Sequence, residues 1–169
     1  GALPLSLFNG LLAFDDFAHT FRIVFALVSA IIVSFTAPAA LGGSDVGAQK
    51  NPGELFALLI TVTLGLNMMA ASRNLLMIYL SLEMVSVISF VLAGFKLGDR
   101  KSAEGALKYV IFGGVASGVM LYGMSWIYGL TQSLHLPSIL ARVAALTQSQ
   151  GKVPEAVVVG VVCMLAGFG

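Results

Sequence analysis

Charged residues are scarce in this sequence. Only 10% of its 169 residues are Asp, Glu, Lys or Arg, whereas 58% are hydrophobic and the mean hydropathy is +0.96. In soluble domains about a quarter of all residues are charged, so the composition predicts a membrane protein. The net charge of +1 provides no basic field for nucleic acid and no acidic tail.

Cysteine and histidine are scarce as well. Cys163 is the only cysteine, which excludes an internal disulfide and a thiolate metal cluster. His19 and His135 stand far apart in polar neighbourhoods, so we expect surface histidines and no haem or metal site. The sequence also lacks a phosphate-binding glycine loop, an HExxH motif and a nucleophile elbow. Soluble redox or hydrolytic chemistry is therefore not expected in this chain.

Long apolar runs are what the sequence does contain. Five segments approach the roughly 20 residues that a helix needs to cross about 30 Å of hydrocarbon, and none alternates with a period of two. They cover approximately residues 17–40, 55–71, 74–95, 105–130 and 156–169. The last run is still apolar at Gly169, which predicts that its helix continues beyond this sequence. We predict an all-α, polytopic membrane helix bundle, with residues 1–169 as part of one membrane domain.

The connections contain helix-capping signals. In GGSDVGAQKNPGE, Asn51 is expected to cap the following helix, with Pro52 at its first position and Glu54 completing a capping box. Asp15 and Asp16 are expected to cap the first helix and to interact favourably with its dipole.

A short helix is predicted within the polar loop of residues 131–155. Ile139, Leu140, Val143 and Leu146 share one face at helical spacing, while Arg142 lies elsewhere. This pattern is typical of a helix lying along the membrane surface, and a simply packed loop helix is the alternative.

Basic residues suggest an orientation in the membrane. Lys96, Arg100 and Lys101 crowd one short loop, and the positive-inside tendency places that loop and the Lys50 loop in the cytoplasm. The basic residues then expected on the opposite side are Arg73, Arg142 and Lys152. The basic counts of the two sides are nearly balanced.

Glu83 is the main candidate for chemistry. It is the only charged residue of NLLMIYLSLEMVSVISFVLAGF (residues 74–95), nine positions from one end and twelve from the other, hence near the bilayer midplane. A carboxylate there costs about 2.5 to 3.5 kcal/mol on insertion scales. Tyr79 and Ser86 share its helical face. Intramembrane carboxylates mark proton relays, so we interpret Glu83 as a proton-pathway residue; a neutral, hydrogen-bonded packing residue is the alternative.

Lys108 is the second candidate. It lies near the start of its helix, where a lysine can extend to the interface, and Glu104 four residues earlier offers an ordinary ion pair. A surface pair and a pathway role therefore both remain open. Asn67 adds polarity to the second apolar segment, together with Thr61 and Thr63, and either solvates a pathway or cross-links helices.

Small residues recur at helical spacing after Lys108. Gly114 and Gly118 form a GxxxG pattern, and Gly113 and Ser117 repeat the spacing. Because small residues at this period allow helices to approach closely, we predict helix packing here.

Two longer stretches resemble a known family. LSLEMVSVISFVLAGF, followed by RKSAEGALKYVIFGGVASGVMLYGMSWIYGLT, resembles the antiporter-like subunit N of respiratory complex I, the NADH dehydrogenase subunit 2 type. FDDFAHTFR and MLAGFG resemble it too, so the resemblance covers nearly the whole chain. It implies a bundle of about fourteen helices built from inverted repeats, of which this chain would supply the third to the start of the seventh.

The resemblance also implies roles. Glu83 on the fifth helix would act with a lysine of the seventh helix, expected just after AGFG, and Lys108 on the sixth would belong to the same charged group. Protons would move through these residues, coupled to quinone reduction elsewhere. NAD, flavin, iron–sulfur clusters and quinone would be bound outside this chain. The implied location is the inner (plasma) membrane of a bacterium, with other complex I membrane subunits and lipid as partners and no nucleic acid.

Two alternative functions remain. One is a subunit of a monovalent cation/proton antiporter or a membrane-bound hydrogenase of the same fold, which a sodium requirement would favour. The other is a structural membrane scaffold, which is favoured if neutral isosteres of Glu83 and Lys108 leave transport unchanged.

Overall fold

Six helices and one small hairpin make up the described part of the chain. The computed structural model describes residues 5–8, 10–41, 52–96 and 98–168. The helices are α1 (Asp16–Leu41), α2 (Pro52–Ala71), α3 (Leu75–Ala93), α4 (Arg100–Thr131), α5 (Leu136–Gln150) and α6 (Glu155–Phe168). Strands β1 (Leu5–Leu7) and β2 (Leu12–Phe14) pair in antiparallel register before α1. The predicted all-α membrane bundle is confirmed, and the hairpin is an addition whose three-residue strands are too short to show a period in the sequence.

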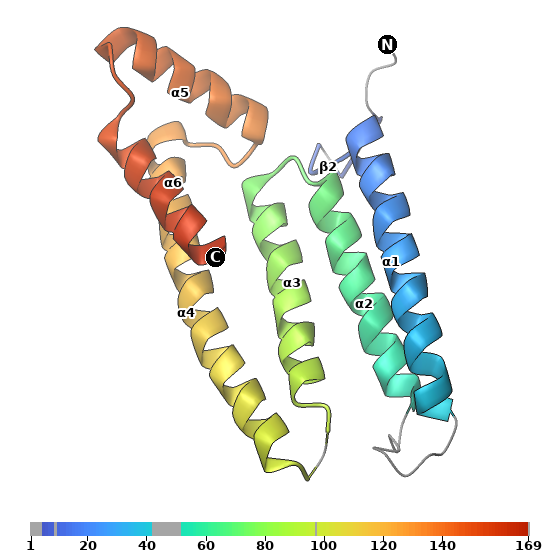
Figure 1. Ribbon diagram of the computed structural model, residues 1–169. Helices are drawn as coiled ribbons and strands as arrows, with labels where there is room; N and C mark the ends of the chain where they lie inside the picture. Colours follow the sequence, from blue (N-terminus) through green and yellow to red (C-terminus); the bar gives the residue numbers. More distant parts are fainter. Residues whose placement is uncertain (1–4, 9, 42–51, 97, 169) are drawn as a thin grey trace.

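Four of the described helices, α1 to α4, are long and apolar enough to cross a membrane. Each packs against the next, and Figure 1 shows them side by side and running in alternating directions. The 32 residues of α4 would extend about 48 Å, so this helix is longer than the hydrocarbon layer. At 14 residues, α6 is shorter, and it packs antiparallel along α4.

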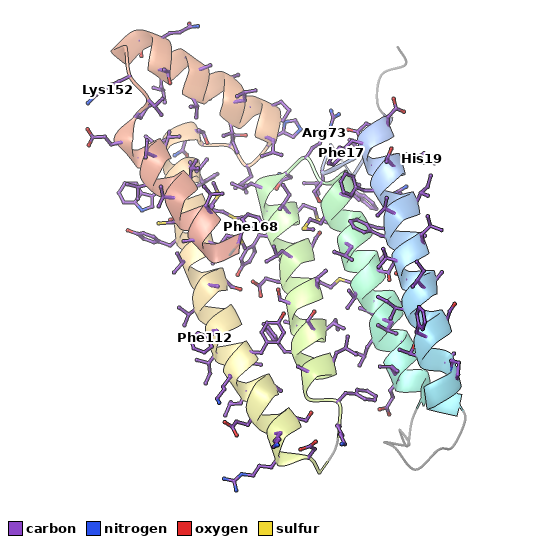
Figure 2. All side chains as sticks on the ribbon, in the orientation of Figure 1. Phe17, His19, Arg73, Phe112, Lys152 and Phe168 are labelled. Carbon is purple, nitrogen blue, oxygen red and sulfur yellow. The ribbon has the colours of Figure 1, made fainter. Side chains whose placement is uncertain are left out.

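The turn between α2 and α3 joins three segments at one end of the bundle. The Arg73 N–H donates to the Leu11 carbonyl of the hairpin, and the Arg73 carbonyl accepts from the Leu136 N–H at the start of α5, each at 3.0 Å. The Arg73 guanidinium also pairs with Asp15 before α1, at 3.2 Å. Arg73 and Phe17 are labelled at this end in Figure 2. One residue therefore links the hairpin, the residue before α1 and the start of α5.

Asp15 caps α1 as predicted. Its Oδ1 accepts a hydrogen bond from the Ala18 N–H at 2.9 Å, and Asp16 lies in the first turn. The bond from Ala18, followed by the Arg73 guanidinium, lowers the pKa of the Asp15 carboxyl, although partial burial acts in the opposite direction. The predicted cap Asn51 lies outside the described residues, and Glu54 lies in the first turn of α2.

A cluster of buried hydrophobic side chains lies where α3, α4 and α6 meet. Met120 is 0% exposed, and Met124, Ile127, Val157 and Leu75 surround it. Main chains of α4 and α6 come very close here, because a methyl group added at Gly123 would lie 2.5 Å from the Gly160 carbonyl oxygen. Glycine at these two positions permits the helix contact.

The packing prediction for Gly114 and Gly118 requires a correction within this chain. A methyl group added at either residue would meet no atom within 4 Å. Gly113 instead faces α3, where an added methyl group would overlap the Phe90 ring. Neighbouring helix positions point about 100° apart. The repeat that begins at Gly113 therefore faces the bundle, and the repeat that begins at Gly114 faces away.

The loop helix predicted within residues 131–155 is confirmed as α5. Figure 1 shows it lying across the end of the bundle beyond α4. Ile139 and Val143 pack against the core cluster, but Leu140 is 72% exposed. The buried stripe is thus narrower than the predicted four-residue face.

Charged residues gather at the two opposite ends. Lys96 lies in the α3–α4 connection and Arg100 and Lys101 in the first turn of α4, at the far end from α5 (Figure 1). Arg73 and Lys152 are labelled at the other end in Figure 2. For these residues the separation agrees with the sequence-based grouping. Lys50 lies outside the described residues, and the cytoplasmic assignment stays a prediction.

Candidate functional site

The helix that carries Glu83 is anchored at both ends. At its start, Asn74 Oδ1 accepts from the Leu76 and Met77 N–H groups, at 3.0 and 3.4 Å. The Leu75 N–H donates to the Leu134 carbonyl of the α4–α5 connection at 2.7 Å. At its end, the Ser102 hydroxyl of α4 donates to the carbonyl of Ala93, the last residue of α3, at 2.9 Å. These bonds fix the position of α3 along the bundle.

Glu83 is the ninth of the 19 residues of α3, so its depth is close to the centre of the helix. The residue is partly buried, and its Oε1 is fully buried without a hydrogen-bond partner. No ion pair of Glu83 is found within the described residues. An unpartnered buried carboxylate oxygen is costly in a low-dielectric setting and calls for a functional explanation or for water.

Tyr79 and Ser86, which were predicted to share the helical face of Glu83, lie in two different environments. Tyr79 packs against the core cluster and interacts electrostatically with Glu83 without a hydrogen bond to it. Ser86 lines a cavity between helices. Asn67 belongs to a separate group on α2, because its amide donates to the Thr63 carbonyl at 2.7 Å and Thr63 contacts Ser29 of α1 at 2.6 Å. Thr63 therefore cross-links α2 to α1, which is one of the two interpretations given for these polar residues.

A cavity of about 230 Å³ lies beside the Glu83 helix. Its lining comes from four helices and includes Met69 of α2, Ser86 and Phe90 of α3, Tyr109 and Ser117 of α4, and Phe168 of α6. Figure 2 shows Phe168 at the end of α6, on the side that faces α3. Sequence reasoning treated Ser117 only as a small packing residue. The sequence held one indication that Ser117 faces α3, because Ser117 follows Gly113 by four positions and Gly113 faces α3.

Lys108 makes no ion pair with Glu83 in the described part of the chain, although the family resemblance implied that the two belong to one charged group. Its Nζ pairs with Glu104 at 2.6 Å, and the two side chains are 66% and 57% exposed. Contacts of α4 with α3 explain the separation, since Gly94 faces Ala106 across the interface. Lys108 is therefore level with the end of α3, about ten residues or about 15 Å along the axis from Glu83. A role for Lys108 in a pathway stays a prediction.

The histidines differ in environment. His19 is exposed on α1, as labelled in Figure 2, and His135 is half-buried before the first residue of α5. Across the described ranges, no three His, Cys, Asp or Glu residues come together in a way that could hold a metal ion.

The fold and the site define a multi-pass membrane protein with a carboxylate at mid-depth in an anchored helix, the arrangement of proteins that move ions or protons through helix bundles. The chain belongs to the NADH:quinone oxidoreductase/Mrp antiporter transmembrane family, whose model matches residues 72–169. The matched region contains α3, α4, α5 and α6, and therefore Glu83, Lys108 and most of the cavity lining.

Curated relatives narrow this family. The chain is 62% identical over 168 residues to NADH-quinone oxidoreductase subunit N 2 of Sorangium cellulosum (strain So ce56) and covers 33% of that protein. It is 48% identical over 168 residues to NADH-quinone oxidoreductase subunit N of Anaeromyxobacter sp. (strain Fw109-5) and covers 32% of it. These alignments include 99% and 97% of the chain. The chain thus spans about a third of the length of the relatives it matches.

A solved structure shares the fold. A chain of the membrane-bound sulfane sulfur reductase, an archaeal respiratory membrane complex, matches with a TM-score of 0.68 at 24% identity. The match covers 87% of this chain and 28% of the other. At this level of identity the similarity establishes the arrangement of helices.

Proposed function

We propose that this chain is part of a proton-translocating, antiporter-like membrane subunit of a bacterial NADH:quinone oxidoreductase. The observation that carries the proposal is the buried, unpartnered Oε1 of Glu83 at the centre of α3. The names of the relatives and the family match over residues 72–169 support it. The bacterial relatives also support a location in the inner membrane.

Glu83 is suited to bind and release a proton. In an apolar setting, a nearby cation or water stabilises the carboxylate, and withdrawal of that partner favours the neutral acid. A change that alters the surroundings of Oε1 therefore loads or unloads a proton. We propose that the partner cation comes from a part of the longer protein outside this chain, and that other membrane subunits supply the coupling to redox chemistry.

NAD, flavin, iron–sulfur clusters and quinone are assigned in this proposal to the rest of the complex. The role of this chain is then that of a translocase component. The family description also includes Mrp antiporters, so a cation/proton antiporter subunit is the second candidate. Proton movement that requires sodium would favour that candidate, whereas both relatives described above carry the oxidoreductase name.

The test is Glu83→Gln in the assembled complex, reconstituted in vesicles. Glutamine keeps the shape and hydrogen-bonding capacity of the side chain but cannot titrate, so proton uptake driven by NADH should fall strongly and quinone reduction should slow with it. Glu83→Asp should retain more activity because it keeps a carboxylate. Glu155→Gln is the matched control, since Glu155 is 89% exposed at the start of α6. Full pumping and turnover by Glu83→Gln would leave Glu83 as a structural residue.

A further inference from the structure

One face of α4 is exposed over most of its length. We call it the outer face of α4, and it carries residues spaced by three, four or seven positions, namely Arg100, Glu104, Ile111, Val115, Gly118 and Tyr122. All of them are exposed, and Gly113, which faces α3, lies on the opposite side of the helix. Phe112 is labelled in Figure 2 on the side of α4 away from α3. An exposed apolar surface of this extent normally contacts a lipid or a protein partner.

The middle of the outer face is uncharged over the depth of a hydrocarbon layer. Every exposed residue from 110 to 121 is apolar or a glycine. Val115 is the midpoint, with Lys108 seven residues before it and Tyr122 seven residues after it, each about 10 Å away along the axis. Lysine and tyrosine side chains extend from there to the edges of a layer about 30 Å thick. The uncharged stretch therefore matches the acyl-chain region of a bilayer.

Aromatic residues mark one end of this stretch. Tyr122 and Trp126 pack edge to face, with ring centroids 6.1 Å apart, and both are exposed. Tyrosine and tryptophan are enriched where a membrane meets water. Arg100 lies 26 residues before Trp126, or about 39 Å along the axis, which is close to the 40–45 Å thickness of a bilayer with its headgroups. Arg100 is therefore expected at the level of the opposite headgroups.

The other end carries positive charge that the chain does not neutralise. Residues 96–108 contain four basic and two acidic residues, which leaves an excess of two positive charges. Both acidic residues already pair with lysines, at 3.4 and 2.6 Å. Arg100 and Lys101 are exposed, and their side chains make no ion pair within the described residues. Two cations at the level of the headgroups are complementary to a phosphate.

We propose that the outer face of α4 contacts the bilayer directly, and that Arg100 and Lys101 bind the phosphate of an anionic phospholipid whose acyl chains lie along residues 110–121. This lipid belongs to the leaflet on the side of the α3–α4 connection. A transmembrane helix is the competing occupant. It fits less well, because it would have to supply acidic partners to both cations, and because the aromatic end is typical of a surface in contact with lipid. The inference is independent of the proton role of Glu83.

The first experiment identifies the lipid in contact with α4. The assembled complex is reconstituted in phosphatidylcholine vesicles with a trace of phosphatidylglycerol or phosphatidylcholine that carries the same photoreactive acyl chain. After illumination, mass spectrometry quantifies labelling within residues 109–131. A basic residue near a membrane surface favours an anionic lipid about fivefold, so phosphatidylglycerol should label α4 at least fivefold more than phosphatidylcholine does. Arg100→Gln combined with Lys101→Gln should make labelling by the two lipids equal.

The control variant removes the same number of charges at the opposite end of the bundle. Arg142→Gln combined with Lys152→Gln should leave the lipid preference of α4 unchanged. Raised salt gives a test without any substitution, because screening should reduce the preference in the wild-type complex. Equal labelling of wild-type α4 by the two lipids, or an equal effect of the control variant, would overturn the headgroup site. Absence of labelling by either lipid would show that protein covers this face and would overturn the whole proposal.

The second experiment tests whether a helix covers the outer face. A methyl group added at Gly114 meets no atom within 4 Å, whereas one added at Gly113 would overlap the Phe90 ring. Gly114→Leu should assemble with an unchanged thermal midpoint, because acyl chains adapt to a larger side chain. Gly113→Leu should impair assembly, which shows that the assay detects overpacking. Loss of assembly in Gly114→Leu as well would identify a protein partner at this face and refute the lipid contact.

Discussion

The contact between α4 and α6 predicts a sharp effect of Gly123→Ala. The added methyl group would lie 2.5 Å from the Gly160 carbonyl oxygen and 2.8 Å from Cys163 Cβ, whereas ordinary contacts begin at 3.4 Å. The helices would have to separate by about 0.9 Å, because a neighbouring main chain cannot rotate away as a side chain can. Overpacking of this kind costs about 1–3 kcal/mol. Alanine recovers up to about 1 kcal/mol of helix propensity, so we expect a net loss of up to about 2 kcal/mol.

The same displacement should also reach the functional site. The far end of α6 carries Gly167, where an added methyl group would lie 2.5 Å from Met120 Cβ, and Phe168, which lines the cavity. Movement of α6 away from α4 therefore changes the wall of the cavity beside Ser86. Proton uptake by the Gly123→Ala variant should therefore fall by a larger fraction than the amount of assembled complex does.

The first measurement is the temperature at which half of the purified complex has lost this subunit, detected by size-exclusion chromatography. The second is proton uptake at a temperature where the complex is intact. Gly129→Ala is the matched control, because a methyl group added at Gly129 of α4 meets nothing within 4 Å in this chain. This control should be neutral or slightly stabilising. A midpoint for Gly123→Ala equal to that of Gly129→Ala would refute the close approach of α4 and α6.

Two further predictions concern charged pairs. Asp15 has a lowered pKa, so its contribution to stability is present above its ordinary value of 3.8 and is lost as the pH falls through the lower folded value. Asp15→Asn should lower the thermal midpoint at pH 7 by an amount equivalent to at most about 1 kcal/mol. The difference from wild type should vanish in acid. A difference that stays constant with pH would contradict the lowered pKa of Asp15. Lys108→Ala should cost at most about 0.5 kcal/mol and reduce proton uptake less than Glu83→Gln, since the Glu104 pair is exposed; an equal loss of uptake would show that Lys108 acts in another arrangement.

Much of the fold follows from local patterns in the sequence. Apolar runs of sufficient length predict the helices, and the position of Glu83 within its run predicts its depth. The cap at Asp15 and the helix α5 are local as well, because a side-chain oxygen before a helix and a short apolar stripe act over only a few residues.

The remaining features depend on how helices face one another. The repeats that begin at Gly113 and at Gly114 differ by one position, so the rotation of α4 about its axis decides which of them faces the bundle. That rotation is visible only in the tertiary structure, where Gly113 faces the Phe90 ring of α3. Lys108 has both a local partner and a distant candidate in the sequence, and the α3–α4 register decides between them. The exposure of a hydroxyl to a cavity, as at Ser117, is a tertiary property that a helical pattern indicates only indirectly.

The anchoring of α3 has a consequence for the membrane potential. Its two ends are tied to the Leu134 carbonyl and the Ser102 hydroxyl, which hold α3 in place along the bundle. With α3 spanning the membrane as proposed, Glu83 then lies near the middle of the electric field. One charge that crosses the whole membrane at 100 mV exchanges about 2.3 kcal/mol with the field, so a proton bound at Glu83 has traversed about half of that. The proton-binding constant of Glu83 should then change roughly sevenfold per 100 mV, and the steps before and after it should share the electrical work about equally.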